Sequence, residues 1–166
     1  MLKPPRHLPR LAAILLLIAT LLAAWAAWGP AAQSDSLAAH DGDTQTLSLG
    51  GESFTVELAT TPASRQRGLM HRQALPADRG MLFIFPDEAP RTFWMKQVRF
   101  AIDILYLDTD WRIVHLIAGA PPCMDTPCET YPSQRPARYV LELPAGTSAR
   151  LGMQPGQQLS PPKNPS

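Results

Sequence analysis

The sequence predicts a mainly β domain, either a compact β-sandwich or a partly closed barrel, with about seven to eight short strands and two short helices. Three observations lead to this prediction. Apolar and polar residues alternate at period two along much of the chain, as they do in strands. Glycine and aspartate clusters separate these stretches as turns do. The stretches that carry helix-capping residues are short. A hydrophobic N-terminal helix is expected to precede the domain.

The first strands follow from these patterns in chain order. Residues 54–58 alternate, and the preceding Gly50-Gly51 is typical of a hairpin turn. Residues 80–85 are apolar on both faces, which is typical of a central buried strand. Residues 92–96 are a further strand candidate.

The later strands are predicted in the same way. Residues 101–107 and 111–118 flank Asp108-Thr109-Asp110, and together they predict a second hairpin. Residues 138–143 alternate again, with the apolar side chains of the odd-numbered residues on one face. These six stretches and the hairpin partner before Gly50 supply the expected strands.

Two short helices fit between the strands. For the first, Thr61 is the expected N-cap, Pro62 the first helical residue and Gly68 the C-terminal stop. The second runs over about residues 147–151 and ends at Gly152.

The N-terminus predicts export. Residues 11–28 form an 18-residue apolar run broken only by Thr20, and three cations and no acid precede it. As a helix this run would be about 27 Å long, enough to cross a bilayer core, with the rest of the chain facing outward. We favour an uncleaved membrane anchor over a cleaved signal peptide, whose apolar stretch is usually shorter. Ala24-Trp25-Ala26 keeps the cleaved alternative open. In either case the domain is expected on the periplasmic face of the cytoplasmic membrane.

The domain boundaries follow from composition. The anchor or signal occupies residues 1–28, and the small, polar residues 29–44 are a flexible linker. Residues 45–159 form a single β-rich domain. The proline-rich residues 160–166 are predicted to be a disordered tail.

Charge and motif content exclude several function classes. The formal net charge is +1, and no basic stripe is present, which argues against nucleic acid as a partner. The chain contains no G-x-S-x-G, H-E-x-x-H, phosphate-loop or dinucleotide fingerprint. The absence of these motifs argues against the commonest enzyme classes. Enzymes of other classes stay open.

Six sequence motifs occur in the order RGLM (67–70), LPADRGMLFIF (75–85), FWMK (93–96), DILYLD (103–108), APPC…PC…YPS (120–133) and ARYVLELPAG (137–146). In this order they resemble the prokaryotic family known as domain of unknown function 192, over about residues 52–159. The resemblance implies a small, mostly β domain that is often exported. It implies no established activity, substrate or catalytic residue.

The two cysteines predict a structural disulfide. Outside the cytoplasm, Cys123 and Cys128 are expected to oxidise, since the four residues between them can turn tightly enough to bring the Cα atoms within about 6 Å. A redox pair or two thiolate metal ligands are the alternatives. Redox cysteines usually open a helix, which Pro121, Pro122 and Pro127 oppose here. The scattered methionines are expected to pack in the core, and no metal or cofactor is predicted.

Asp103 is the main candidate for a functional side chain. It lies between two isoleucines in an apolar strand, so its carboxylate must be paired, hydrogen-bonded or at a sheet edge. In one interpretation it makes an ion pair or caps backbone amides and so holds strands together. In the other, it forms a ligand site with four further side chains, namely Arg72, Trp94, Lys96 and Arg138.

Two functions from different classes remain. We favour a non-catalytic binding module that recognises an envelope component, a glycan or a small anionic ligand, through this ligand site. The alternative is a small exported hydrolase or lyase with Asp103 as general base and Lys96 or Arg72 as electrostatic stabiliser. A metal or redox role of Cys123 and Cys128 ranks third.

Overall fold

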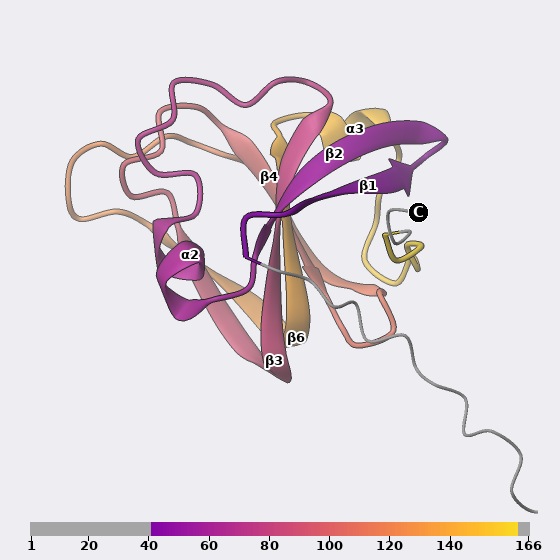
Figure 1. Cartoon of the computed structure of the whole chain (residues 1–166). Helices are drawn as coiled ribbons and strands as arrows, with labels where there is room; N and C mark the ends of the chain where they lie inside the picture. The colour runs from indigo at the N-terminus through magenta and orange to yellow at the C-terminus, as the bar shows by residue number, and fades with distance from the viewer. Residues whose placement is uncertain (1–40, 163–166) are drawn as a thin grey trace, which may run out of the picture. The chain divides into compact units, whose positions relative to one another are not determined.

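The computed structural model describes residues 41–162, which form one six-stranded mixed sheet with two short helices (Figure 1). The strands are β1 (Thr44–Leu49), β2 (Glu52–Ala59), β3 (Arg79–Trp94), β4 (Ile102–Leu107), β5 (Ile113–Ala120) and β6 (Thr130–Pro144). The helices are α2 (Pro62–Arg67) and α3 (Thr147–Arg150). The predicted anchor, nearly all of the linker and the end of the tail lie outside the described residues. Within residues 41–162, no helix is long and apolar enough to span a membrane.

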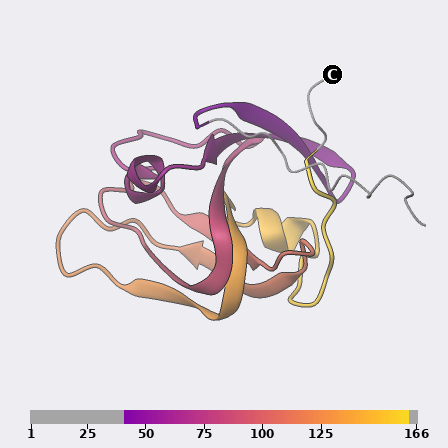
Figure 2. The same ribbon diagram turned by 60° about the horizontal axis from the view of Figure 1, so that its bottom comes forward.

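The mainly β class is confirmed, but the strands are fewer than predicted and form a single open sheet in the order β1-β2-β3-β6-β4-β5. The stretch 80–85 and residues 92–94 of the stretch 92–96, predicted as separate strands, belong to the one long strand β3, which ends at Trp94. β6 likewise starts at Thr130, well before the predicted residue 138. The β3–β6 register shifts between Ile84 and Ala89, and such irregularities let a long strand pair bend without ending. Figure 2 shows the two strands curving together.

Both predicted hairpins are confirmed. The β1–β2 turn has Gly50 at φ 57° and Gly51 at φ 85°, the left-handed conformation that the favoured two-residue hairpin turns require. In the β4–β5 hairpin, one carboxylate oxygen of Asp108 accepts hydrogen bonds from the backbone amides of Asp110 at 3.0 Å and Arg112 at 2.8 Å. Local residues therefore fix both turns.

Both predicted helices are also confirmed. Thr61 is the N-cap of α2: its hydroxyl accepts from the Ser64 amide at 3.1 Å, while the Ser64 hydroxyl accepts from the Thr61 amide at 3.1 Å. α2 ends at Gly68, as expected. α3 is a single turn that follows Gly146.

The central part of the sheet is buried on both faces. Side chains of directly paired residues lie on the same face, and successive rows alternate between faces. One buried row is Phe83, Val140 and Tyr106, which belongs to a core cluster with Met81 and Ile104. The next row, on the opposite face, is Leu82, Leu141 and Leu105, and it is equally buried. A polar side chain in this part of the central strands, such as Asp103 of β4 or Glu142 of β6, is therefore forced into the interior.

Candidate functional site

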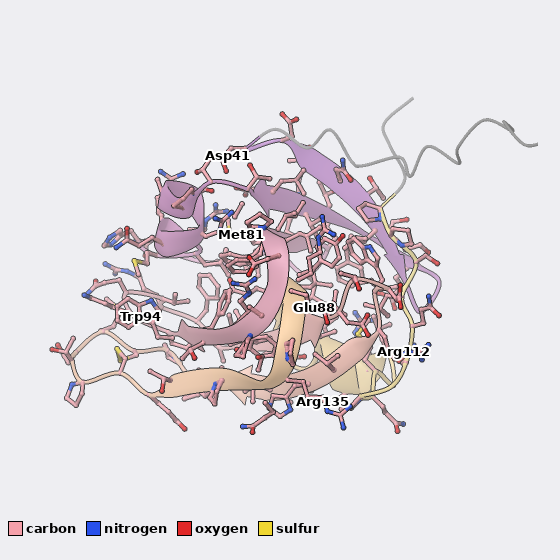
Figure 3. The ribbon with its side chains drawn as sticks, turned by 90° about the horizontal axis from the view of Figure 1, so that it is seen from below. Asp41, Met81, Glu88, Trp94, Arg112 and Arg135 are labelled. Carbon is pink, nitrogen blue, oxygen red and sulfur yellow. A yellow bond between two sulfur atoms is a disulfide. The ribbon has the colours of Figure 1, made fainter. Side chains whose placement is uncertain are left out.

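A cavity of about 320 Å³ lies between the end of α2 and the strand β3. It is lined by Arg65–Met70, by Phe83, Phe85, Thr92, Phe93 and Trp94 of β3, by Lys96 and Val98, and by Glu142 of β6. Figure 3 shows β3 curving from Met81 near its start to Trp94 at its end. Because β3 bends, residues from both ends of this strand reach one cavity.

The inner wall of the cavity is aromatic. The rings of Phe83 and Phe93 pack edge to face with centroids 4.8 Å apart, and Phe85 meets Phe93 in the same way at 6.4 Å. Phe93 in turn packs edge to face against Tyr106 of β4 at 5.9 Å. These contacts fix the rings, so the wall is a rigid apolar surface on which a flat or apolar ligand body could lie.

Cations surround this wall. Arg65 donates to the backbone carbonyls of Thr60 and Ile84, the latter at 2.9 Å, and its guanidinium lies 4.9 Å from the centroid of Phe85. The ammonium of Lys96 lies 5.1 Å from the Trp94 ring centroid. Arg67 also lines the cavity, and neither it nor Lys96 makes an ion pair with a described residue.

Glu142 is the only acidic residue of the lining, and it is deeply buried, with 4% of its surface exposed. Burial raises the pKa of its carboxyl to about 8, while the nearby charge of Arg72 acts in the opposite direction. None of the described residues donates a hydrogen bond to this carboxyl. The cavity thus contains a carboxyl group that is neutral at pH 7 and has a free donor and free acceptors.

Of the residues predicted as a site, Trp94 and Lys96 line this cavity together. Arg72 does not line it. Its guanidinium makes two hydrogen bonds to the carboxylate of Glu57, at 2.5 and 2.8 Å, which raises the pKa of Arg72 and lowers that of Glu57. Arg72 affects the site only because its positive charge lowers the pKa of Glu142.

Asp103 lies on β4, away from the cavity lining, and is completely buried. One carboxylate oxygen accepts from the amides of Gly119 at 2.8 Å and Gly146 at 3.2 Å. The other accepts from the amide and the hydroxyl of Ser148, both at 2.7 Å. Asp103 therefore caps the start of α3 and ties β4 to β5, which favours the interpretation in which it holds elements together.

Arg138 also lies outside the lining. Its guanidinium is 5.7 Å from the ring centroid of Tyr139, and its Nε atom is buried without a hydrogen-bond partner among the described residues. The structure therefore brings Trp94 and Lys96 together and leaves Arg72, Asp103 and Arg138 elsewhere.

Sequence reasoning missed Glu142. The signal that singled out Asp103, an acid between aliphatic residues, also applies here, since Leu141 and Leu143 flank Glu142. The alternation in residues 138–143 places Tyr139, Leu141 and Leu143 on one face and says nothing of the other face, which carries Glu142. In the structure both faces of β6 are covered in this region, so Glu142 is buried as well.

The disulfide supports one edge of the cavity. Cys123 and Cys128 are joined, with their Cα atoms 5.9 Å apart, in agreement with the prediction. The Cys123 carbonyl accepts from the Gln97 amide at 2.8 Å, and the Cys123 amide donates to the Val98 carbonyl at 3.2 Å. The cross-linked loop is thus hydrogen-bonded to the segment that carries Lys96. No group of three His, Cys, Asp or Glu residues that could hold a metal ion occurs within residues 41–162.

Comparisons with known proteins place this fold among related chains. The model of the family DUF192, described as "Uncharacterized ACR, COG1430", matches residues 45–161. The crystal structure of a candidate transcription regulator from Sinorhizobium meliloti 1021 is similar to this fold, with a TM-score of 0.62. The two sequences are 37% identical, and the match covers 70% of this chain and 90% of that chain. The crystal structure of a protein of unknown function from Novosphingobium aromaticivorans DSM 12444 also has a TM-score of 0.62. Its sequence is 30% identical, and the match covers 80% of this chain and 99% of that chain. No curated protein matches significantly.

Proposed function

The chain belongs to the DUF192 family. We propose that it is an exported binding module and that its cavity between α2 and β3 binds a small anionic ligand. The observation that carries the proposal is the composition of the cavity: a fixed aromatic wall, three cationic residues and one buried carboxyl. Its volume of about 320 Å³ is at the lower end of the range of small-molecule sites.

The charges of the lining favour an anion. Arg65, Arg67 and Lys96 carry full positive charges, whereas burial keeps Glu142 protonated at pH 7. The cavity is therefore positively charged around an apolar wall, which attracts an anion with an apolar body. The cationic lining favours an anionic ligand over an uncharged envelope glycan.

Binding is favoured over catalysis by Asp103. Both oxygens of the carboxylate that would serve as general base already accept hydrogen bonds, and Asp103 does not line the cavity. A hydrolase or lyase that uses this residue finds no support in its surroundings.

The disulfide supports a location outside the cytoplasm, where such cross-links form and persist. We propose that residues 11–28, which lie outside the described residues, hold the domain at the periplasmic face of the membrane. Nucleic acid is not proposed as a partner. From Leu11 onward the formal charge is 12 − 14 = −2, after the three cations before that residue are removed from the total.

The test uses benzoate as a probe and its neutral analogue benzamide as a control, with the chain as it is exported. We expect benzoate to bind more tightly and to shift the NMR signals of residues 65–70 and 92–96. Lys96→Gln and Arg67→Gln should weaken benzoate binding about tenfold each, whereas Arg135→Gln, an exposed cation outside the lining, should not. Equal binding of both probes, or no binding of benzoate, contradicts the proposal.

A further inference from the structure

We infer that Glu142 selects the ligand by a hydrogen bond to a neutral hydroxyl group, which lies at the opposite end of the ligand from its anionic group. The ligand class is therefore a hydroxylated aromatic carboxylate. This inference rests on the proposed function and assigns a specificity-determining residue to the same cavity.

The described residues leave the Glu142 carboxyl without a hydrogen-bond partner. Glu142 pairs in register with Met81 on β3 and Ile104 on β4, and neither side chain can donate a hydrogen bond. Two donors lie close enough to interact electrostatically with Glu142, and both are engaged: Arg72 binds Glu57, and the Tyr106 hydroxyl donates to the Tyr131 carbonyl at 2.5 Å. A partner for the carboxyl must therefore come from the cavity.

A buried polar group without a hydrogen-bond partner destabilises the state in which it is left unpaired. A ligand that supplies the missing partner recovers this free energy, and an analogue that lacks the group does not. Sites of this kind discriminate strongly between ligands that differ by one hydroxyl group.

The protonation state of Glu142 decides which polar group of a ligand it can bind. At pH 7 the carboxyl of Glu142 is neutral, because burial raises its pKa to about 8, so it both donates and accepts. A neutral hydroxyl matches both roles. A ligand ammonium would instead require the ionised carboxylate and would release a proton on binding.

The two ends of the ligand can be placed by burial. Glu142 is almost completely covered, whereas Trp94 is 44% exposed and Arg67 is exposed at the end of α2. The anionic group therefore lies toward the exposed Arg67 and the partly exposed Lys96, and the hydroxyl lies toward the interior. The body between them contacts Phe83 and Phe93, which favours an aromatic ring.

The experiment compares benzoate with p-hydroxybenzoate and m-hydroxybenzoate by calorimetry at pH 7, with the chain as it is exported. We expect the wild type to bind at least one hydroxybenzoate about tenfold more tightly than benzoate. Glu142→Gln, which keeps a donor and an acceptor, should preserve this preference. Glu142→Leu should bind benzoate and the hydroxybenzoates equally. Glu52→Gln, at an exposed acid outside the cavity, is the control.

The possible failures are distinct. If benzoate does not bind, the proposed function is contradicted. If benzoate binds and the hydroxyl adds nothing, or if Glu142→Leu keeps the preference, only the role of Glu142 is contradicted. If a hydroxybenzoate binds with release of a proton, the neutral carboxyl is the wrong form, and the inference fails in favour of an ionised one. Thermal unfolding of each variant shows that it is folded before it is titrated.

Discussion

Ser148 donates two hydrogen bonds to the same carboxylate oxygen of Asp103, one from its backbone amide and one from its hydroxyl, both at 2.7 Å. The two residues are 45 positions apart in the sequence. Asp103 therefore performs from strand β4 the role that an N-cap side chain usually performs from the residue before a helix, since Gly146 has no side chain to do so.

Replacement of Asp103 should destabilise the fold without affecting the cavity. In Asp103→Asn one acceptor becomes an amide donor that faces other donors, so we expect a loss of about 3 kcal/mol in the free energy of unfolding, measured with urea. Ser148→Ala, which removes one of the hydrogen bonds, should lose about 1 kcal/mol. Benzoate affinity should stay unchanged in any folded variant. A stable Asp103→Asn chain would contradict this assignment.

The stability of the protein should depend on the protonation of Glu142. Its pKa is about 8 in the folded chain and near the ordinary 4.5 in the unfolded chain, so the folded state holds a proton that the unfolded state releases in this range. The contribution of this proton to the free energy of unfolding is fully present below pH 4.5 and is lost as the pH rises to about 8. Relative to Glu142→Gln, the wild type should lose on the order of 3 kcal/mol between about pH 5 and pH 8.

A second variant checks the cause of this pH dependence. The positive charge of Arg72 lowers the pKa of Glu142, so Arg72→Gln should raise that pKa further and move the loss of stability to higher pH. NMR titration of the Glu142 carboxyl measures the shift directly. Identical pH profiles for the wild type and Glu142→Gln would show that Glu142 titrates normally in the folded chain.

Loss of the disulfide should affect both stability and binding. The double variant Cys123→Ser/Cys128→Ser should lose about 2 kcal/mol, the modest amount expected for closing so short a loop. Because the loop is hydrogen-bonded to Gln97 and Val98, next to Lys96, benzoate should also bind a few-fold more weakly. Intact-mass measurement of the exported wild type should show the loss of the two hydrogens that disulfide formation removes. A reduced wild-type chain would contradict the prediction.

Gly80 should tolerate no side chain. An added Cβ would lie 2.7 Å from the backbone oxygen of Glu142 and 2.9 Å from a methyl group of Leu143. The first contact is with backbone in the middle of the sheet and cannot be relieved by rotation of a side chain. We expect Gly80→Ala to lose on the order of 2 kcal/mol in urea unfolding. Wild-type stability of this variant would indicate that β3 and β6 can separate slightly at this point.

The elements that depend on neighbouring residues could be predicted from the sequence. Thr61, Pro62 and Gly68 define α2, and the two-glycine turn defines the first hairpin, because capping and turn hydrogen bonds join residues that are close in the chain. The disulfide could be predicted for the same reason. The number of strands could not, since the continuity of β3 through its irregular region depends on pairing with β6, about fifty residues later.

The candidate site shows more clearly what could not be predicted from the sequence. Asp103 and Glu142 have the same sequence signal, an acid between two aliphatic residues of a strand, and both are buried. The sequence alone determined that such acids need partners. The folded chain gives Asp103 its partners in Gly119, Gly146 and Ser148, whereas Glu142 faces a cavity and has no hydrogen-bond partner among the described residues. The physical reason is that burial and hydrogen-bond partners come from distant segments, whose relative positions the packing of the whole sheet sets.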